Sequence, residues 1–148
     1  MPLRRGSPLP SLEGATETFN MDGFDPADLK GHPVLVHFWG VSCHTCHAVM
    51  DQVTAIRDEN PELKFVGVHM PQREADTDVE LVKKDIEEYG LTHPIFVDNT
   101  HAITRNFENQ FVPAFYLFDR EGKLFFRASG DKFMDKLREK VAELKAAN

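Results

Sequence analysis

The chain has 148 residues, of which 41% are hydrophobic and 28% are charged, a length and balance typical of one globular domain rather than of a disordered chain. Its formal net charge is −7, and the lysines and arginines are interspersed among acidic residues rather than clustered. This charge would repel a nucleic acid or an anionic membrane surface, so we expect neither as a partner.

The first 31 residues predict an irregular lead-in that ends in a short helix. Asp25 and Pro26 supply an N-cap and a proline at the first helical position, and Gly31 ends the helix after residues 27–30. No apolar segment at the start of the chain resembles the core of a signal peptide, and no run is long enough to cross a bilayer. We therefore expect a cytoplasmic protein.

Two buried strands and two helices are predicted next. Residues 34–39 and 63–69 form nearly continuous apolar runs, which suit strands that are buried on both faces. Between them, apolar residues at helical spacing predict a helix over 43–58. A second helix is predicted over 79–89, with Gly90 just beyond its C-terminal end.

Three more strands are predicted in the rest of the chain, over 94–97, 114–118 and 123–128. The last two are joined by Asp119-Arg120-Glu121-Gly122, a sequence typical of a hairpin turn. This order of elements predicts an α/β fold with a central mixed sheet and helices on both faces. Because no repeat or linker is present, we expect one domain over residues 1–148.

Two more helices are predicted in this part of the chain. The first carries Ile103 and Phe107 and is capped by Asn99 or Thr100. The second follows Asp131, which can serve as its cap. Its apolar stripe consists of four residues, Phe133, Leu137, Val141 and Leu144.

Both cysteines of the chain lie in the string Cys43-His44-Thr45-Cys46-His47, directly after the first buried strand. The string alone is compatible with a covalent haem site, with half of a zinc site and with a redox-active dithiol. A disulfide between cysteines this close would restrict the unfolded chain very little, and structural disulfides are rare in the cytosol. The pair therefore points to catalysis or to metal binding.

The predicted position of the pair, where a strand ends and a helix begins, favours the dithiol. The N-terminus of a helix directs unpaired N–H groups and the positive end of its dipole at the Cys43 sulfur, which stabilises the reactive thiolate and lowers its pKa. Cys46 lies one turn further in, close enough for a disulfide yet more enclosed. We predict that Cys43 attacks a substrate disulfide and that Cys46 resolves the mixed disulfide.

The segments FWGVSCHTC and FVPAFYLFDREGK resemble the thioredoxin superfamily, and within it the TlpA/ResA/DipZ-like thiol-disulfide oxidoreductases. The resemblance covers about residues 32–147, including an extra helix and strand at 76–97 that this group inserts into the thioredoxin fold. Small cytosolic YkuV-type thioredoxin-like proteins are the most similar, segment for segment. The resemblance implies an enzyme without a prosthetic group that acts, as a monomer, on disulfide-containing proteins. Its electrons would come from a thioredoxin-reductase-like enzyme or another dithiol protein.

The resemblance also implies a substrate-binding surface around the dithiol. Val112-Pro113 is expected to be a cis peptide bond, beside which the Val112 backbone pairs with an extended substrate segment. Trp39 is expected to shape the same surface, because Ser42 stands where family members commonly have a tryptophan. His37 replaces a buried acid that is held to relay the proton of the resolving cysteine.

The residues between the cysteines are candidates for tuning the couple. A cationic imidazole at His44 would favour the Cys43 thiolate and raise the reduction potential; the alternative is a solvated histidine with little effect. Thr45, the other residue between the cysteines, is a further candidate for supporting the dithiol. His47 is expected to be a solvated helix residue.

Three other interpretations use the same string. In a c-type cytochrome both cysteines would hold haem and His47 would be its axial ligand, but a buried strand followed by an α/β chain is the wrong architecture. A zinc site needs about four ligands, and a second CxxC is absent, so His37, His44 or His47 would have to complete the set. A thioredoxin-fold binding module with an incidental dithiol is the third.

Overall fold

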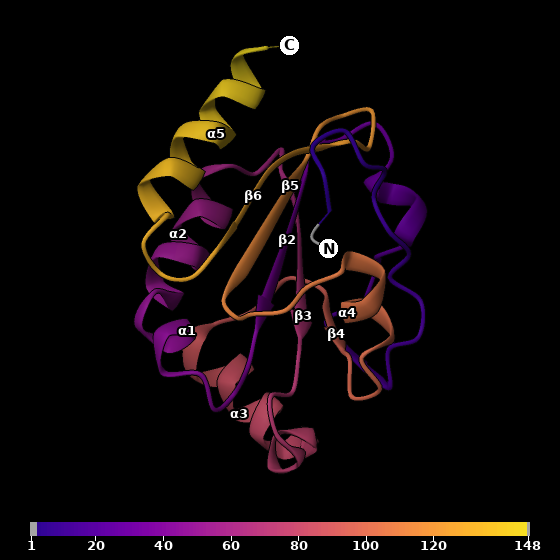
Figure 1. Cartoon of the computed structure of the whole chain (residues 1–148), viewed down its shortest axis with the longest axis vertical. Coiled ribbons are helices and arrows are strands. Elements are labelled where there is room, and N and C mark those ends of the chain that lie inside the picture. The colour runs from indigo at the N-terminus through magenta and orange to yellow at the C-terminus, as the bar shows by residue number, and fades with distance from the viewer. Residues whose placement is uncertain (1–2, 148) are drawn as a thin grey trace.

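The structure is a computed structural model that describes residues 3–147, and its centre is a six-stranded sheet. Its strands lie in the spatial order β1 (Glu17–Phe19), β4 (Ile95–Val97), β3 (Lys64–His69), β2 (Val34–Trp39), β5 (Ala114–Phe118) and β6 (Leu124–Ser129). β2, β3 and β4 run parallel, whereas the remaining pairs are antiparallel. The predicted α/β class with a mixed sheet is confirmed (Figure 1).

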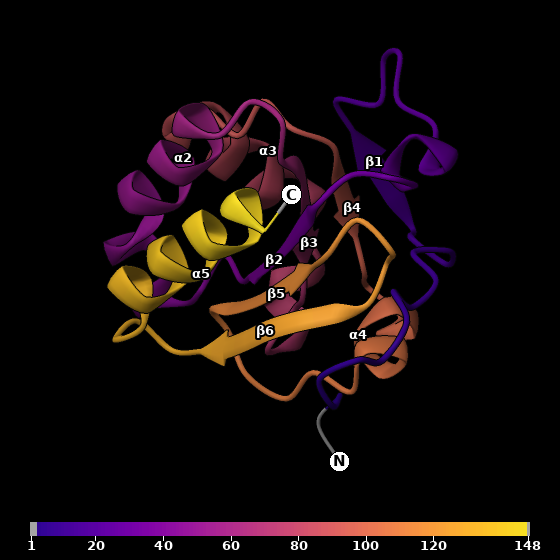
Figure 2. The same cartoon turned by 90° about the horizontal axis from the view of Figure 1, so that it is seen from above.

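Five α-helices and two 3₁₀ turns surround the sheet in the described part of the chain. They are α1 (His44–Ala48), α2 (Met50–Glu59), α3 (Val79–Tyr89), α4 (Ala102–Phe107) and α5 (Met134–Ala146), with turns at Pro26–Leu29 and Glu74–Thr77. α2, α3 and α5 lie on one face of the sheet, and α4 with the N-terminal lead-in covers the other (Figures 1 and 2). No helix within residues 3–147 combines the length and the apolar character that a membrane span requires.

The central strand β2 is buried along its whole length because both faces of the sheet are covered. Leu35 and Trp39 belong to the apolar cluster beneath α2 and α5, whereas Val34, Val36 and Phe38 belong to the cluster beneath α4 and the lead-in. This alternation follows from the two-residue period of a strand. A continuous apolar run was therefore the right signal for this strand.

The lead-in contains a strand that we did not predict. β1 pairs antiparallel with β4, and the Asn20 side chain that follows it donates hydrogen bonds to the carbonyls of Leu91 and His93, at 2.7 and 3.0 Å. Three residues without apolar alternation carry little strand signal by themselves. The partner strand, almost eighty residues away, determines that they are extended.

Two predicted helix caps are wrong. The N-cap residue of α4 is His101, which adopts the left-handed conformation and makes no side-chain cap hydrogen bond; the carboxylate of Asp98 instead accepts the amides of Ile103 and Thr104 at 3.0 and 2.7 Å. Neither Asn99 nor Thr100 is the cap. A capping side chain usually belongs to the residue directly before the first turn of a helix. The carboxylate of Asp98 lies further upstream, so its role is not apparent from the residues next to the helix.

The start of α5 also differs from the prediction. Asp131 does not cap the helix, which begins three residues later, and Phe133 is the N-cap residue without a side-chain hydrogen bond. Phe133 is 47% exposed, and Met134 takes its place at the start of the buried stripe. The other three predicted stripe residues, Leu137, Val141 and Leu144, are buried.

The helix predicted over 43–58 is divided into α1 and α2. The division falls at Val49, which leaves the helical region with φ −103° and ψ 2°. α3, in contrast, has the predicted bounds, and Gly90 at its C-terminal end adopts the left-handed conformation with φ 63°, for which glycine has no steric penalty.

Loops from several strands meet at one edge of the sheet. The parallel strands β2, β3 and β4 all end there, with Trp39 beside His69 and His69 beside Val97. β5 runs in the opposite direction and begins at the same edge, since Ala114 pairs with Phe38. Ligand and catalytic sites of parallel sheets form at this kind of edge, and both cysteines follow β2 directly.

Candidate active site

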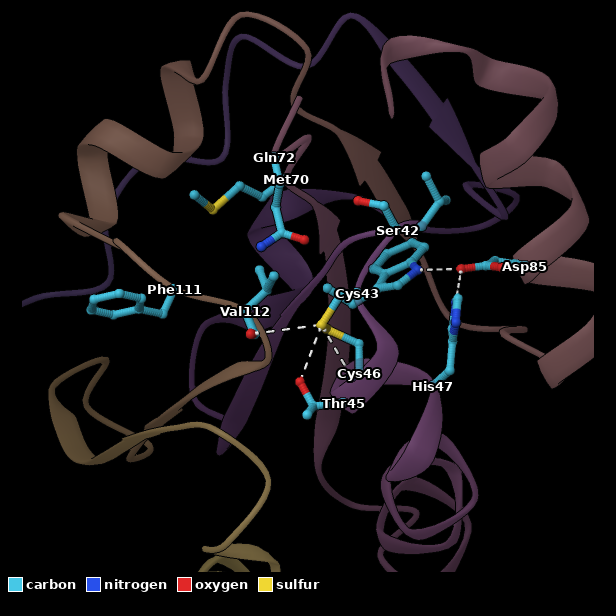
Figure 3. Close-up of a disulfide and its surroundings, with 12 residues drawn as sticks. Ser42, Cys43, Thr45, Cys46, His47, Met70, Gln72, Asp85, Phe111 and Val112 are labelled. Carbon is cyan, nitrogen blue, oxygen red and sulfur yellow. Dashed lines mark hydrogen bonds and ion pairs between the residues drawn. A yellow bond between two sulfur atoms is a disulfide. The ribbon is translucent and has the colours of Figure 1, made fainter. Parts of the chain in front are cut away.

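Cys43 and Cys46 form a disulfide at the start of α1 (Figure 3). Cys43 is the N-cap residue, and the backbone N–H of Cys46 donates a hydrogen bond to its sulfur at 3.1 Å. An amide directed at the sulfur stabilises negative charge there. Cys43 is 6% exposed and Cys46 is fully buried, so Cys46 is the more enclosed residue, as the sequence predicted.

The loop before β5 lies against the Cys43 sulfur. The Val112 carbonyl oxygen is 3.7 Å from Sγ, and the pairing of Ala114 with Phe38 brings it there (Figure 3). The peptide bond between Val112 and Pro113 is cis, the isomer that the resemblance implied. Val112 is half-buried and Pro113 is buried, so the surface of this loop is formed by residue 112 rather than by the proline ring.

The two residues between the cysteines are exposed. Thr45 places its Oγ1 3.5 Å from the Cys43 sulfur. His44 is the first residue of α1 and lies in solvent. Both therefore belong to the surface that a partner of the disulfide would meet.

His37 lies in the core on the same side of β2 as Trp39. Its ring stacks on Phe115, with ring centroids 5.0 Å apart, and is 6.2 Å from the ring of Trp39. Burial lowers the pKa of His37 from 6.5 to about 3, so the ring is neutral at pH 7. Neither ring nitrogen hydrogen-bonds to a sulfur or to any other group within residues 3–147.

Trp39 does not shape the surface, and that expectation is wrong. Its side chain is fully buried, and its Nε1 donates a hydrogen bond to Asp85 Oδ2 at 3.0 Å. Trp39 is the last residue of β2, and its side chain points toward the face of the sheet that α2, α3 and α5 cover. Asp85 of α3 supplies the acceptor there. The exposed aromatic side chain near the disulfide is Phe111, 65% exposed and directly before Val112 (Figure 3).

Asp85 is the site residue that sequence reasoning missed. Its Oδ2 also lies 2.8 Å from His47 Nε2, so one buried carboxylate binds both the end of β2 and the residue after Cys46 (Figure 3). His47 also stacks on Tyr89, with ring centroids 5.1 Å apart, so it is not the solvated residue that we expected. A signal existed: Asp85 falls three residues after the buried Val82 on α3, and a carboxylate on a buried helix face needs a partner.

The described residues contain no group of three or more histidine, cysteine, aspartate or glutamate side chains that could hold a metal ion. His37, His44 and His47, the residues that would have completed a zinc set, diverge from the cysteines. His37 is buried in the core, His44 is exposed, and His47 is bound to Asp85. The arrangement fits a reversible disulfide better than a ligand set.

Comparisons with known proteins agree with this chemistry. Residues 4–144 match the Redoxin family. The thiol-disulfide oxidoreductase YkuV of Bacillus subtilis (strain 168) is 40% identical over 142 residues, which is 95% of each chain. ResA of Bacillus anthracis, also a thiol-disulfide oxidoreductase, is 29% identical over 74% of this chain and 62% of its own.

Solved structures show the same fold. A thioredoxin-like protein in its oxidised form superposes with a TM-score of 0.85 at 39% identity, over 97% of each chain. A secreted disulfide oxidoreductase of Mycobacterium tuberculosis, homologous to DsbE of E. coli, gives a TM-score of 0.70 at 26% identity, over 82% of this chain and 88% of the other.

Proposed function

The chain belongs to the Redoxin family and is a thiol-disulfide oxidoreductase, and we propose that it reduces disulfides of cytoplasmic proteins, with Cys43 as the attacking thiol and Cys46 as the resolving thiol. The observation that carries this assignment is the asymmetry of the pair. Cys43 is the less buried of the two residues, its sulfur receives the Cys46 amide and lies beside the Val112 carbonyl, whereas Cys46 is fully buried.

The proposed reaction begins with the reduced protein. The Cys43 thiolate attacks one sulfur of the substrate disulfide, that bond breaks, and the departing thiolate takes up a proton. Cys46 then loses its proton and attacks the Cys43 sulfur, which releases the second substrate thiol and forms the internal disulfide. A thioredoxin-reductase-like enzyme or another dithiol protein returns two electrons and two protons, and we propose that the protein acts as a monomer.

The loop around Val112 is the proposed contact for the substrate backbone. Its carbonyl lies beside the Cys43 sulfur, and Phe111 next to it presents an exposed aromatic ring. An extended segment that paired with this loop would hold its disulfide at the Cys43 sulfur, as an added strand does at a sheet edge. Side chains of that segment would contact Phe111 and the exposed Thr45.

A trapping experiment tests the proposed substrates. In cells that express Cys46→Ser, mixed disulfides with Cys43 cannot be resolved, so cytoplasmic proteins are expected to remain covalently attached and to be released by dithiothreitol. The double variant Cys43→Ser/Cys46→Ser is the control and is expected to retain none. If Cys46→Ser captures no protein while Cys43 still reacts with iodoacetamide, the protein-disulfide assignment is wrong and a small thiol is the better substrate.

The proposal for His44 predicts a change in redox poise. Because His44 is exposed beside Cys43, replacing its imidazole is expected to destabilise the thiolate and to lower the reduction potential by about 10–30 mV, a two- to tenfold change in the equilibrium with glutathione. Equilibration of His44→Ala in glutathione buffers at pH 7 measures this change, with the exposed His32→Ala as the control. A potential equal to that of the unmodified protein would remove His44 from the mechanism.

A further inference from the structure

The segment that follows β3 packs directly on the loop that carries the disulfide. The Met70 amide donates to the Trp39 carbonyl at 2.9 Å, and the Val41 amide donates to His69 Nε2 at 3.1 Å. Gly40 lies so close to this segment that a Cβ there would be 3.2 Å from the Met70 carbonyl oxygen. Residues 69–76 therefore define the path of the chain into Cys43.

Asp76 is the last residue of this segment, and its side chain binds Ser42, the residue directly before Cys43. Its Oδ2 accepts the Ser42 hydroxyl at 2.7 Å and the Gln72 amide at 3.0 Å, and its Oδ1 accepts Arg73 Nε at 3.3 Å. The Asp76 side chain is fully buried. Burial acts to raise its pKa, but the hydrogen bonds from Ser42, Gln72 and Arg73 outweigh that effect and hold the pKa below its usual value. The carboxylate is therefore ionised at pH 7.

The charge of Asp76 is only partly balanced. Within the described residues the cation bonded to it is Arg73, whose side chain is 69% exposed, so solvent weakens its field. His69 also faces Asp76, but burial lowers the pKa of His69 to about 4 and leaves it neutral at pH 7. The shallow pocket of about 340 Å³ that Asp76 and Ser42 line is bordered by further charged or titratable groups, Lys84, Asp85, Glu88 and His47.

We propose that Asp76 is a positioning residue that also sets the reduction potential: it fixes Ser42 and keeps a negative charge at the residue directly before Cys43. This inference rests on the proposed attack by Cys43. In the exchange, one internal disulfide and two glutathione thiols become one dithiol and one glutathione disulfide. A fixed anion disfavours the Cys43 thiolate in the dithiol state, whereas the disulfide carries no charge, so Asp76 shifts this equilibrium toward the disulfide and makes the couple more reducing.

The test compares Asp76→Asn with two controls. The amide keeps an oxygen acceptor for Ser42 and Gln72 but removes the charge, so the equilibrium constant with glutathione is expected to move three- to tenfold toward the dithiol, about 14–30 mV. The pKa of Cys43, read from the pH profile of iodoacetamide alkylation, is expected to fall in parallel. Ser42→Ala, which keeps the charge, and Glu74→Gln, which removes an exposed charge from the same turn, are both expected to leave the potential close to the original.

Two outcomes overturn the inference. In the first, Asp76→Asn leaves both the potential and the alkylation profile unchanged; in the second, Ser42→Ala shifts them as much as Asp76→Asn does, which would mean that the hydrogen bond to Ser42, and not the charge of Asp76, sets the potential. Thermal unfolding of each variant in its oxidised form shows whether the fold is kept; if Asp76→Asn does not fold, Asp76→Ser, which is also neutral and keeps a hydroxyl that can hydrogen-bond, replaces it and is expected to shift the equilibrium in the same direction. Insulin reduction by the unmodified protein tests the proposed function separately, so the inference about Asp76 can fail while the catalytic assignment stands.

Discussion

Cys43→Ser is expected to lower the rate of insulin reduction by on the order of a thousandfold or more, to the rate with dithiothreitol alone, because it removes the proposed nucleophile. Cys43 is the residue whose sulfur receives the Cys46 amide at 3.1 Å, and it is 6% exposed, whereas Cys46 is fully buried. In Cys43→Ser the remaining sulfur of Cys46 is buried, so it cannot substitute as the attacking group. Insulin precipitation with dithiothreitol as the electron source measures this loss.

Serine at position 46 is expected to give a different result. Cys46→Ser also loses multiple turnover, but its single thiol remains accessible and forms one equivalent of mixed disulfide with a small disulfide reagent. Alkylation of the reduced protein provides a second measure, since Cys43 is expected to react at lower pH and faster than Cys46. Rapid alkylation of Cys46 in Cys43→Ser, at a rate that matches Cys43 in Cys46→Ser, would contradict the assigned order.

The parts of the site that follow from local sequence were predictable. β2 is a continuous apolar run, and the cysteines follow it where a helix begins, so the position of Cys43 at the edge of a buried sheet could be inferred from neighbouring residues alone. The same holds for Gly90, which follows an apolar stripe at helical spacing. These predictions needed no knowledge of how distant segments meet.

The parts that depend on distant segments were not predictable in this way. Trp39 was assigned to the surface because Ser42 stands where family members commonly have a tryptophan. The partner of its buried side chain comes from α3, which supplies Asp85 across 46 positions of sequence. The bond between Ser42 and Asp76 spans 34 positions and depends on the path of the chain after β3. A polar residue on an otherwise buried face signals that a partner exists, but the identity of that partner comes from the packing of the elements.

Loss of stability in mild acid is the second large effect that we expect. Burial lowers the pKa of His37 from 6.5 to about 3 and that of His69 to about 4, and it lowers the pKa of His93 well below its usual value. As the pH falls from 6.5, the unfolded chain takes up protons at these positions while the folded chain does not, so the free energy of unfolding decreases. Each histidine contributes up to about 1.4 kcal/mol per pH unit.

Between pH 6.5 and pH 5 the three histidines together are therefore expected to remove roughly 4–6 kcal/mol, a large part of the 5–15 kcal/mol that stabilises a typical domain. Urea unfolding of the oxidised protein at pH 7, 6 and 5 measures the decrease. In His37→Leu the decrease between pH 6.5 and pH 5 is expected to be smaller by about 2 kcal/mol. In His32→Gln, which removes an exposed histidine, the decrease is expected to be the same as in the unmodified protein.

The same variant separates two roles of His37, because stability and catalysis are measured independently. If His37 is only a neutral core residue stacked on Phe115, His37→Leu weakens the acid dependence of unfolding and leaves the rate at which Cys46 resolves a mixed disulfide unchanged. If it also relays the proton of Cys46, that rate falls at pH 7 in His37→Leu while the protein stays folded. A pH dependence of unfolding that is identical in the two proteins would show that His37 binds its proton equally in the folded and unfolded chain, and would contradict its burial as a neutral ring.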